Sequence, residues 1–258
     1  MSDLNTEPRL PLGDRTRTGQ AQLTNMSLAL RTLMDVQDVP QHQPRLALFY
    51  GFSGYGKTVA AAFTAARTDA VYISAQSIWT QRSILEAIAE ELGVTRLERT
   101  SPRILRQIID HLNYAPRPLI IDEMDHLVKK QSVEIIRDIH DHTSVGIMMI
   151  GEEGMPSKLK EWERFDNRIR SATAAQPASL QDARRLADHY CTRVQIADDL
   201  VKLFQDRCRG VTRRIVTNLT IAEQAALVDG MDGIDANWWA TRPIATGDLP
   251  VRRMKDAA

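Results

Sequence analysis

The chain has 258 residues, 43% of them apolar and 26% charged, a composition typical of a folded protein with room for one α/β core and a smaller second lobe. Its 33 basic and 33 acidic residues cancel, so overall charge does not indicate a nucleic-acid partner, which would need a local basic surface. With only two cysteines, no apolar run of membrane-spanning length and a polar first twenty residues, we exclude a disulfide scaffold and expect a reduced cytosolic protein.

The first two thirds of the chain predict strands that alternate with helices. Residues 1–19 carry prolines, glycines and scattered charges, typical of a mobile arm, and apolar spacing then predicts a leading helix within 20–39. Strand-like apolar runs follow at 45–50, 70–74, 118–122 and 145–150, and helical patterns lie between them at 57–67, 84–92, 104–112 and 133–139. This alternation predicts a parallel sheet covered by helices on both faces.

Strand signals stop after about residue 177. Helical patterns at 180–191, 198–209 and 212–228 predict a small all-helical lobe over 177–229, and the stretch 230–258 reads as an irregular tail. That tail contains the pair Trp238-Trp239, which either anchors a partner protein or packs back on the helical lobe.

Residues 51–58, GFSGYGKT, form a complete phosphate-binding loop between an apolar strand and an alanine-rich helix. In the pattern G-x-x-x-x-G-K-[ST], glycines turn backbone N–H groups onto phosphate oxygens, the lysine reaches the β- and γ-phosphates, and the hydroxyl ligates Mg²⁺. We therefore expect ATP and Mg²⁺ as cofactors; the alternative is a glycine-rich turn with an exposed lysine. The expected nucleotide-binding residues of this segment are Gly51, Ser53, Gly54, Gly56, Lys57, Thr58 and Val59.

Asp122 and Glu123 end an apolar strand about 65 residues later in the chain. Ligands bind beyond the carboxyl ends of parallel strands, so a carboxylate pair at such an end favours a role at the nucleotide. We expect Asp122, with Thr58, to hold Mg²⁺ and Glu123 to polarise the attacking water. The alternative is an acidic pair that only faces solvent.

Candidate residues at three further places in the chain complete the predicted site. Glu152 follows the fourth strand, where a polar residue would meet the γ-phosphate, although a carboxylate is electrostatically awkward there. Arg164 and Arg168 lie beyond that strand, and either would suit a guanidinium that stabilises transition-state charge on a neighbouring subunit's nucleotide, with Arg170 next in line. Arg213 opens a helix of the predicted lobe and would close over the phosphates. For each, the alternative is a solvated surface charge.

In this order and at these spacings, the elements resemble the AAA+ ATPases over residues 20 to about 229. Residues 51–58 are similar to Walker A and 119–123 to Walker B, whereas sensor 1 at 151–152, the arginine box at 164–168 and sensor 2 at 210–213 are looser matches. The resemblance implies a P-loop α/β domain over 20–176, a helical lid over 177–229 and ATPase activity. A polar uncharged residue is commoner than Glu152 at sensor 1.

The stretches 74–77, 84–93, 121–127 and 149–153 are similar to the initiator-like and transposition-helper branch, and within it to the phage Mu transposition protein B group. This resemblance implies an ATPase of the bacterial host cytoplasm that forms filaments on duplex DNA without sequence preference. It also implies that the protein delivers this DNA to a cognate transposase and activates it, with weak hydrolysis stimulated by DNA or transposase. Expected partners are duplex DNA, further copies of the chain and a transposase, and no membrane.

The same resemblance places the DNA contacts on loops that face a filament's inner channel. The candidates are Thr80, Gln81 and Arg82 after the second strand, and Lys129 and Lys130 beyond the third. Lysine and arginine neutralise phosphates, while threonine and glutamine add hydrogen bonds without reading bases. The alternative for both clusters is an ordinary solvated surface.

Two other functions fit the same motifs. One is a replication initiator or helicase loader, which should contact a helicase; regular filaments on plasmid DNA in electron micrographs would favour transposition instead. The other is a nucleotide-dependent switch with negligible hydrolysis, which an ATPase assay with and without duplex DNA would distinguish.

Overall fold

The computed structural model describes residues 21–37, 39–40 and 42–247, so the predicted arm at 1–19 and the last eleven residues lie outside the described chain. Residues 23–177 form one compact unit, and residues 178–247, with 21–22, belong to another. Among the described residues, no helix is both long and apolar enough to cross a bilayer.

The first unit is built on a five-stranded parallel sheet of order β2-β3-β4-β1-β5. Its strands are β1 (Leu46–Tyr50), β2 (Val71–Ser74), β3 (Leu119–Asp122), β4 (Ile147–Gly151) and β5 (Ile169–Ala174). The four apolar runs of the sequence correspond to β1 through β4. The edge strand β5 was not predicted.

Alternate residues of the buried strands belong to two separate hydrophobic cores, because successive side chains of a strand point to opposite faces of the sheet. Leu46 and Leu48 of β1 belong to one core, and Ala47 and Phe49 belong to the other. Both faces are therefore covered, which explains why these strands read as continuous apolar runs.

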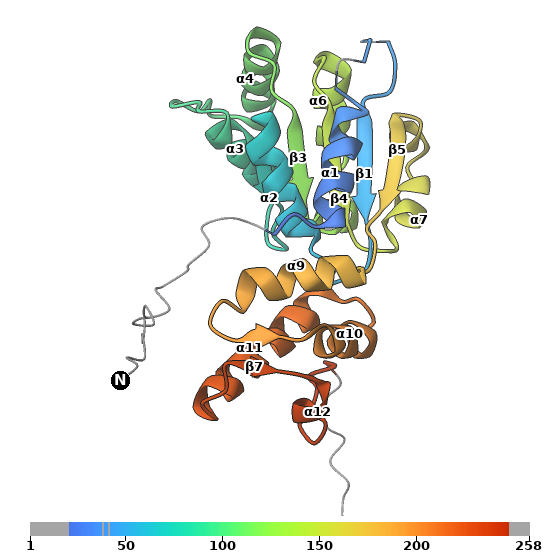
Figure 1. Cartoon of the computed structure of the whole chain (residues 1–258). Coiled ribbons are helices and arrows are strands. Elements are labelled where there is room, and N and C mark those ends of the chain that lie inside the picture. Colours follow the sequence, from blue (N-terminus) through green and yellow to red (C-terminus); the bar gives the residue numbers. More distant parts are fainter. Residues whose placement is uncertain (1–20, 38, 41, 248–258) are drawn as a thin grey trace, which may run out of the picture. The chain divides into compact units, whose positions relative to one another are not determined.

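Helices cover the two faces unequally (Figure 1). The core that contains Ala47 and Phe49 is closed by α1 (Thr24–Met34) and α2 (Lys57–Thr68). The opposite core is closed by six helices: α3 (Gln81–Glu91), α4 (Ser101–Tyr114), α5 (Asp125–Lys129), α6 (Glu134–His142), α7 (Met155–Lys160) and α8 (Glu163–Asp166).

The second unit is mainly helical. Its helices are α9 (Leu180–Tyr190), α10 (Asp198–Arg207), α11 (Thr212–Val228) and α12 (Ala236–Trp239), and a short parallel pair joins β6 (Gln195–Ile196) to β7 (Gly233–Ile234). The first three helices lie where the sequence predicts them.

The sequence predicted an irregular tail over 230–258, and this prediction is corrected for the described part of that stretch. Residues 230–247 contain β7 and α12. Asp235 caps α12 by accepting a hydrogen bond from the Trp238 backbone N–H at 2.8 Å. Trp239 is 3% exposed and packs edge-on against Phe204, with ring centroids 5.5 Å apart. Burial of this aromatic side chain therefore orders the stretch. Two uses were predicted for the tryptophan pair, and Trp239 shows one of them, packing within its own unit.

Candidate active site

The phosphate-binding loop joins the end of β1 to the first turn of α2 and has the backbone that its glycines permit. Gly54 and Gly56 have φ angles of +85° and +82°, a left-handed conformation that other residues rarely adopt. A Cβ atom on Gly51 would lie 2.9 Å from the Cβ of Ala175, so a side chain there would displace the neighbouring strand end. The segment is thus shaped to turn its amides toward a ligand at the amino end of α2.

Lys57 folds back over this loop. Its ammonium donates to the carbonyl oxygens of Gly51 at 2.6 Å and Phe52 at 3.1 Å. Burial lowers the pKa of Lys57, and the negative charge of nearby carboxylates opposes that shift. Those carboxylates are Asp122, Glu123, Glu152 and Asp125. The Lys57 ammonium therefore lies in an acidic environment.

Asp122 and Glu123 lie at the tip of β3, as predicted, but in different environments. Asp122 is 2% exposed, and its oxygens accept hydrogen bonds from the Glu123 backbone N–H at 2.8 Å and the Tyr72 hydroxyl at 3.2 Å. Burial, and next the charge of Asp122, raise the pKa of Tyr72, which keeps that hydroxyl a donor. Glu123 is exposed and has a φ of +54°, an uncommon conformation for a residue with a side chain.

Asn25 of α1 is a supporting residue that the sequence analysis missed. It is 6% exposed and donates to the carbonyl oxygens of Tyr55 and Gln176, each at 2.8 Å. Its side-chain oxygen also accepts the Gln176 backbone N–H at 2.8 Å. Asn25 therefore ties the phosphate-binding loop to the end of β5. The apolar spacing of α1 gives no signal for this role; a polar residue on its buried face is the only sequence hint.

Glu152, the predicted γ-phosphate contact, follows β4 and is part of a small charged cluster. Its backbone N–H donates to Asp125 at 2.7 Å, and Lys158 of α7 lies 2.7 Å from Asp125 and 4.0 Å from the Glu152 carboxylate. The hydrogen bond with Asp125 raises the pKa of Lys158. One cation thus faces two carboxylates here, so Lys158 offsets only part of the acidic charge that made Glu152 an awkward choice. No pattern in the sequence indicated Asp125 or Lys158.

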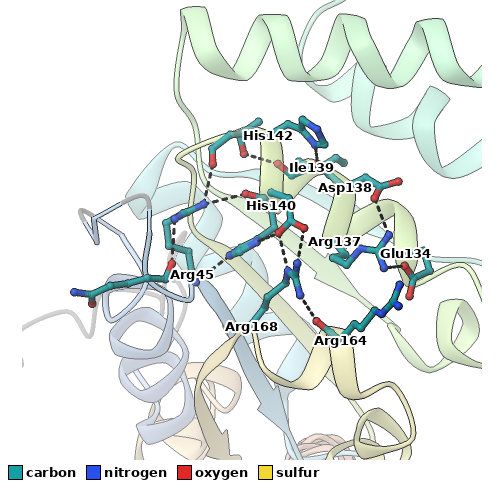
Figure 2. Close-up of polar contacts among 12 residues, drawn as sticks. Arg45, Glu134, Arg137, Asp138, Ile139, His140, His142, Arg164 and Arg168 are labelled. Carbon is teal, nitrogen blue, oxygen red and sulfur yellow. Dashed lines mark hydrogen bonds and ion pairs between the residues drawn. The ribbon is translucent and has the colours of Figure 1, made fainter.

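The two candidate arginines differ in their surroundings (Figure 2). Arg168 donates to the two carboxylate oxygens of Asp141, from Nε at 2.6 Å and Nη2 at 2.7 Å, and its other Nη reaches the backbone carbonyl of Arg164. Arg164 is exposed, and among the described residues no carboxylate pairs with its guanidinium. Arg170, next in line, donates to the Gln43 side chain at 2.9 Å.

A buried network supports Arg168 from the inside of the unit. Arg45 is 1% exposed and donates to the carbonyls of His140 at 2.9 Å and Thr143 at 2.8 Å. The Arg45 backbone N–H donates to Nε2 of His140 at 3.2 Å, so Nδ1 carries the proton and donates to Asp141 at 2.8 Å. Burial lowers the pKa of His140. Burial alone would raise the pKa of Asp141, but hydrogen bonds from Arg168 and His140 lower it to about 2.

The two predicted DNA-contact clusters meet on one surface. Lys130 donates to the backbone carbonyl of Trp79 at 2.8 Å, which joins the loop after α5 to the loop before α3. Thr80 caps α3 by accepting the Ser83 backbone N–H at 3.2 Å. Arg82 is tied to Glu86 at 2.7 Å, so its charge is partly balanced within α3. Gln81 and Lys129 are exposed.

Arg213 lies in the other unit, exposed in the first turn of α11. Its assignment to the phosphates stays a prediction. Within the first unit, the structure brings the glycine loop, Lys57, Thr58, Asp122, Glu123 and Glu152 to the carboxyl edge of the sheet. It places Arg168 at the opposite, amino edge, at the start of β5.

Comparisons with known proteins agree with this architecture. Residues 41–159 match the family model of the AAA domain. A Mu-like prophage DNA transposition protein B from Haemophilus influenzae is 28% identical over 151 residues, which cover 55% of this chain and 52% of that protein. The chain therefore spans about half the length of this curated relative.

Two solved structures of similar fold come from Aeropyrum pernix. The ORC2 protein of Aeropyrum pernix, in ADPNP and ADP complexes, matches with a TM-score of 0.65 and 17% identity over 83% of this chain and 64% of that one. The ORC1 protein of the same organism, in complex with DNA, matches with a TM-score of 0.59 and 20% identity over 84% of this chain and 63% of that one. At such identities the likeness establishes the fold alone.

Proposed function

We propose that this chain, an ATPase with an AAA domain that is similar to a Mu-like DNA transposition protein B, binds duplex DNA under the control of ATP and delivers that DNA to a transposase. The observation that carries this proposal is the phosphate-binding loop set beside Asp122 and Glu123 in a chain with a transposition relative. The finer claims below extend it: filaments, activation of the transposase, and action in a bacterial cytoplasm.

The loop residues fit MgATP, since Gly54 and Gly56 have the left-handed backbone that lets loop amides turn onto phosphate oxygens. Lys57 would exchange its two carbonyl acceptors for the β- and γ-phosphates, and the Thr58 hydroxyl and Asp122 would hold Mg²⁺, directly or through water. When bound, the metal would neutralise phosphate charge that develops during hydrolysis. Asp122 is held for this role by Tyr72, and the exposed Glu123 carboxylate is free to orient and polarise the attacking water.

A second subunit would complete the site. Arg164 is exposed and without a carboxylate partner in the described chain, whereas Arg168 is bound by Asp141. We therefore assign the donor in trans to Arg164 and a positioning role to Arg168. A head-to-tail contact of this kind generates a ring or an open helix. Repetition of a weak basic surface along a duplex then gives avidity that one neutral subunit lacks.

The Lys130–Trp79 contact supports a single DNA-facing surface on each subunit. Thr80, Gln81, Arg82, Lys129 and Lys130 would touch phosphates there without reading bases. Binding would accordingly be sequence-independent and would weaken steeply as salt rises.

The alternative is a replication initiator or helicase loader, because the same nucleotide-binding motifs suit a protein of that class. Electron microscopy of the protein with plasmid DNA and ATP separates the two. Regular filaments with ATP, and none with Lys57→Ala, are the expected result. Isolated particles at a few sites on the plasmid would favour the initiator, and an absence of ATP-dependent DNA binding would reject the proposal.

A further inference from the structure

The loop between α3 and α4, residues 92–100, carries two arginines that no predicted site includes. We call this segment the arginine loop; Figure 1 shows it projecting beside α3. Arg96 and Arg99 are both exposed, and among the residues that the structure describes neither guanidinium has a carboxylate partner. The loop's own acid, Glu98, lies 3.6 Å from Arg103 of α4 instead.

Hydrogen bonds to its backbone hold the arginine loop in shape. Gln107 of α4 binds it twice, accepting the Glu98 backbone N–H at 3.0 Å and donating to the Arg96 carbonyl at 3.0 Å. Leu97 packs inward on the core. With the apolar residue inside and the backbone clamped, the two guanidinium groups are left to face solvent.

The arginine loop is continuous with the surface where the two predicted DNA-contact clusters meet. Arg82 donates to the Arg99 carbonyl at 2.5 Å, so the loop lies against the first turn of α3. Three residues before Arg82, Trp79 accepts the hydrogen bond from Lys130. A chain of contacts thus runs from Lys130 through Trp79 and Arg82 to Arg99.

We propose that the arginine loop binds the phosphate backbone of duplex DNA, with Arg96 and Arg99 as contact residues and Gln107 as the residue that positions them. This inference rests on the proposed function, because it extends the same DNA-facing surface. Exposed cations with threonine hydroxyls on either side, Thr95 and Thr100, suit phosphate oxygens. An acidic protein partner would also meet these cations, but the anchors of stable protein interfaces sit in well-packed, desolvated pockets, and the loop turns its leucine inward and leaves both arginines exposed.

The test is a salt titration of binding to a fluorescent duplex in the presence of ATP, using the full chain. For wild type and for the double variant Arg96→Ala with Arg99→Ala, the logarithm of affinity is plotted against the logarithm of salt concentration. Loss of two phosphate contacts reduces the slope by about 1.8, and lines that meet at about 1 M salt then differ by roughly 60-fold at about 0.1 M. The charge-preserving variant Arg96→Lys with Arg99→Lys should stay within a fewfold of wild type.

Arg106→Ala is the matched control, because Arg106 is an exposed arginine of the neighbouring helix α4 that pairs with Asp110 at 3.1 Å. It should leave the slope unchanged. Wild type that fails to bind duplex DNA would reject the proposed function itself. Wild type that binds, with an unchanged slope in the double alanine variant, would overturn this inference alone. An equal effect of Arg106→Ala, or loss of ATP affinity in the double variant, would also overturn it. DNA binding that persists while transposase stimulation is lost would assign the loop to a protein partner instead.

Discussion

The carboxylate of Asp141 binds the guanidinium of Arg168 through two hydrogen bonds of 2.6 and 2.7 Å, and this pair fixes what each arginine of the 164–168 segment can do. A guanidinium that donates to both oxygens of one carboxylate is already neutralised and oriented. Its remaining donor reaches the Arg164 carbonyl of α8 (Figure 2). The next residue of that helix, Phe165, is fully buried. Arg164 is left as the exposed cation of the segment.

The first prediction follows from this division of roles. Arg164→Ala should retain ATP binding but lose hydrolysis by roughly 1,000-fold in the assembled state, since a donor in trans contributes that much in related phosphoryl transfer. Arg168→Ala should instead lower the free energy of unfolding by about 1–3 kcal/mol, because Asp141 loses its charged donor. Single-turnover hydrolysis and urea unfolding measure the two effects.

A mixing experiment shows whether Arg164 acts on a neighbouring subunit. Arg164→Ala keeps its own Glu123, and Glu123→Gln keeps its Arg164 and still binds ATP, so neither variant should hydrolyse ATP appreciably alone. In an equimolar mixture roughly one interface in four combines the two intact halves, and activity should return at those interfaces. A mixture as inactive as its components, when both variants assemble, would exclude Arg164 as the donor in trans.

The second prediction concerns pH. Folding lowers the pKa of His140 below its ordinary value near 6.5, so between those two values the unfolded chain binds a proton that the folded chain does not. The contribution of the neutral imidazole to the free energy of unfolding is therefore complete above about pH 6.5, and it declines as the pH falls below that value. We expect the free energy of unfolding to decrease on acidification from pH 7.5 to 5.5, and His140→Gln to flatten that decrease.

His142→Gln is the matched control, since His142 is the next-but-one residue, is exposed, and its ring Nδ1 lies 2.8 Å from the Asp138 carbonyl. It should leave the pH profile as in wild type. Asp141 contributes to the free energy of unfolding in a lower pH range. Its pKa of about 2 lies below the ordinary 3.8, so its contribution remains down to about pH 4 and is lost as pH falls through 2. A profile that is flat from pH 7.5 to 5.5 in wild type would contradict the role of His140.

The third prediction tests Asn25 as a support of the phosphate-binding loop. Asn25→Ala removes three hydrogen bonds of 2.8 Å to the backbone of Tyr55 and Gln176. The unpaired groups should lower the free energy of unfolding by about 1–3 kcal/mol, and the loosened loop should bind ATP several-fold more weakly. Thr32→Val cuts another contact between α1 and β5, the 2.8 Å bond to Thr173, away from the loop. If both variants weaken ATP binding equally, Asn25 acts only through the stability of the unit.

Much of the fold could be predicted from sequence because β1 through β4 are buried on both faces and read as apolar runs. The missed strand β5, with sequence IRSATA, is an edge strand of mostly half-exposed and exposed residues, so neither burial nor alternation marks it. Its absence from the prediction also made Arg168 and Arg170 look like a basic turn. Arg170 in fact lies within β5, and Arg168 directly precedes the strand and is held by Asp141.

The site divides in the same way. The glycine loop and the Asp122-Glu123 pair are local patterns, because the residues that act together in each are neighbours in the sequence. The supports are long-range: Asn25 and Gln176 are 151 residues apart, Arg45 and His140 are 95 apart, and Tyr72 and Asp122 are 50 apart. Only the fold brings such pairs together, so one sequence contains no spacing that indicates them.

The last prediction comes from the backbone of Glu123, whose φ of +54° is costly for any residue with a side chain. Glu123→Gln keeps the shape and removes the basicity, so ATP should still bind while hydrolysis falls by about 100-fold or more. Glu123→Gly removes the carboxylate and also the steric cost, so hydrolysis should fall as far while the free energy of unfolding rises by about 1 kcal/mol. A gain in stability with a loss of activity is expected only where a strained position is kept for chemistry.

Gln131 provides the comparison, because it has a φ of +55°, is exposed and lies outside the nucleotide site. Gln131→Gly should raise the free energy of unfolding by a similar amount, about 1 kcal/mol, and leave DNA-free ATP hydrolysis at the wild-type rate. Urea unfolding and a steady-state ATPase assay on the three variants measure both quantities. Hydrolysis by Glu123→Gln at the wild-type rate would show that another group polarises the water. Stabilisation by Gln131→Gly but not by Glu123→Gly would show that the Glu123 side chain stabilises the fold enough to offset its backbone strain.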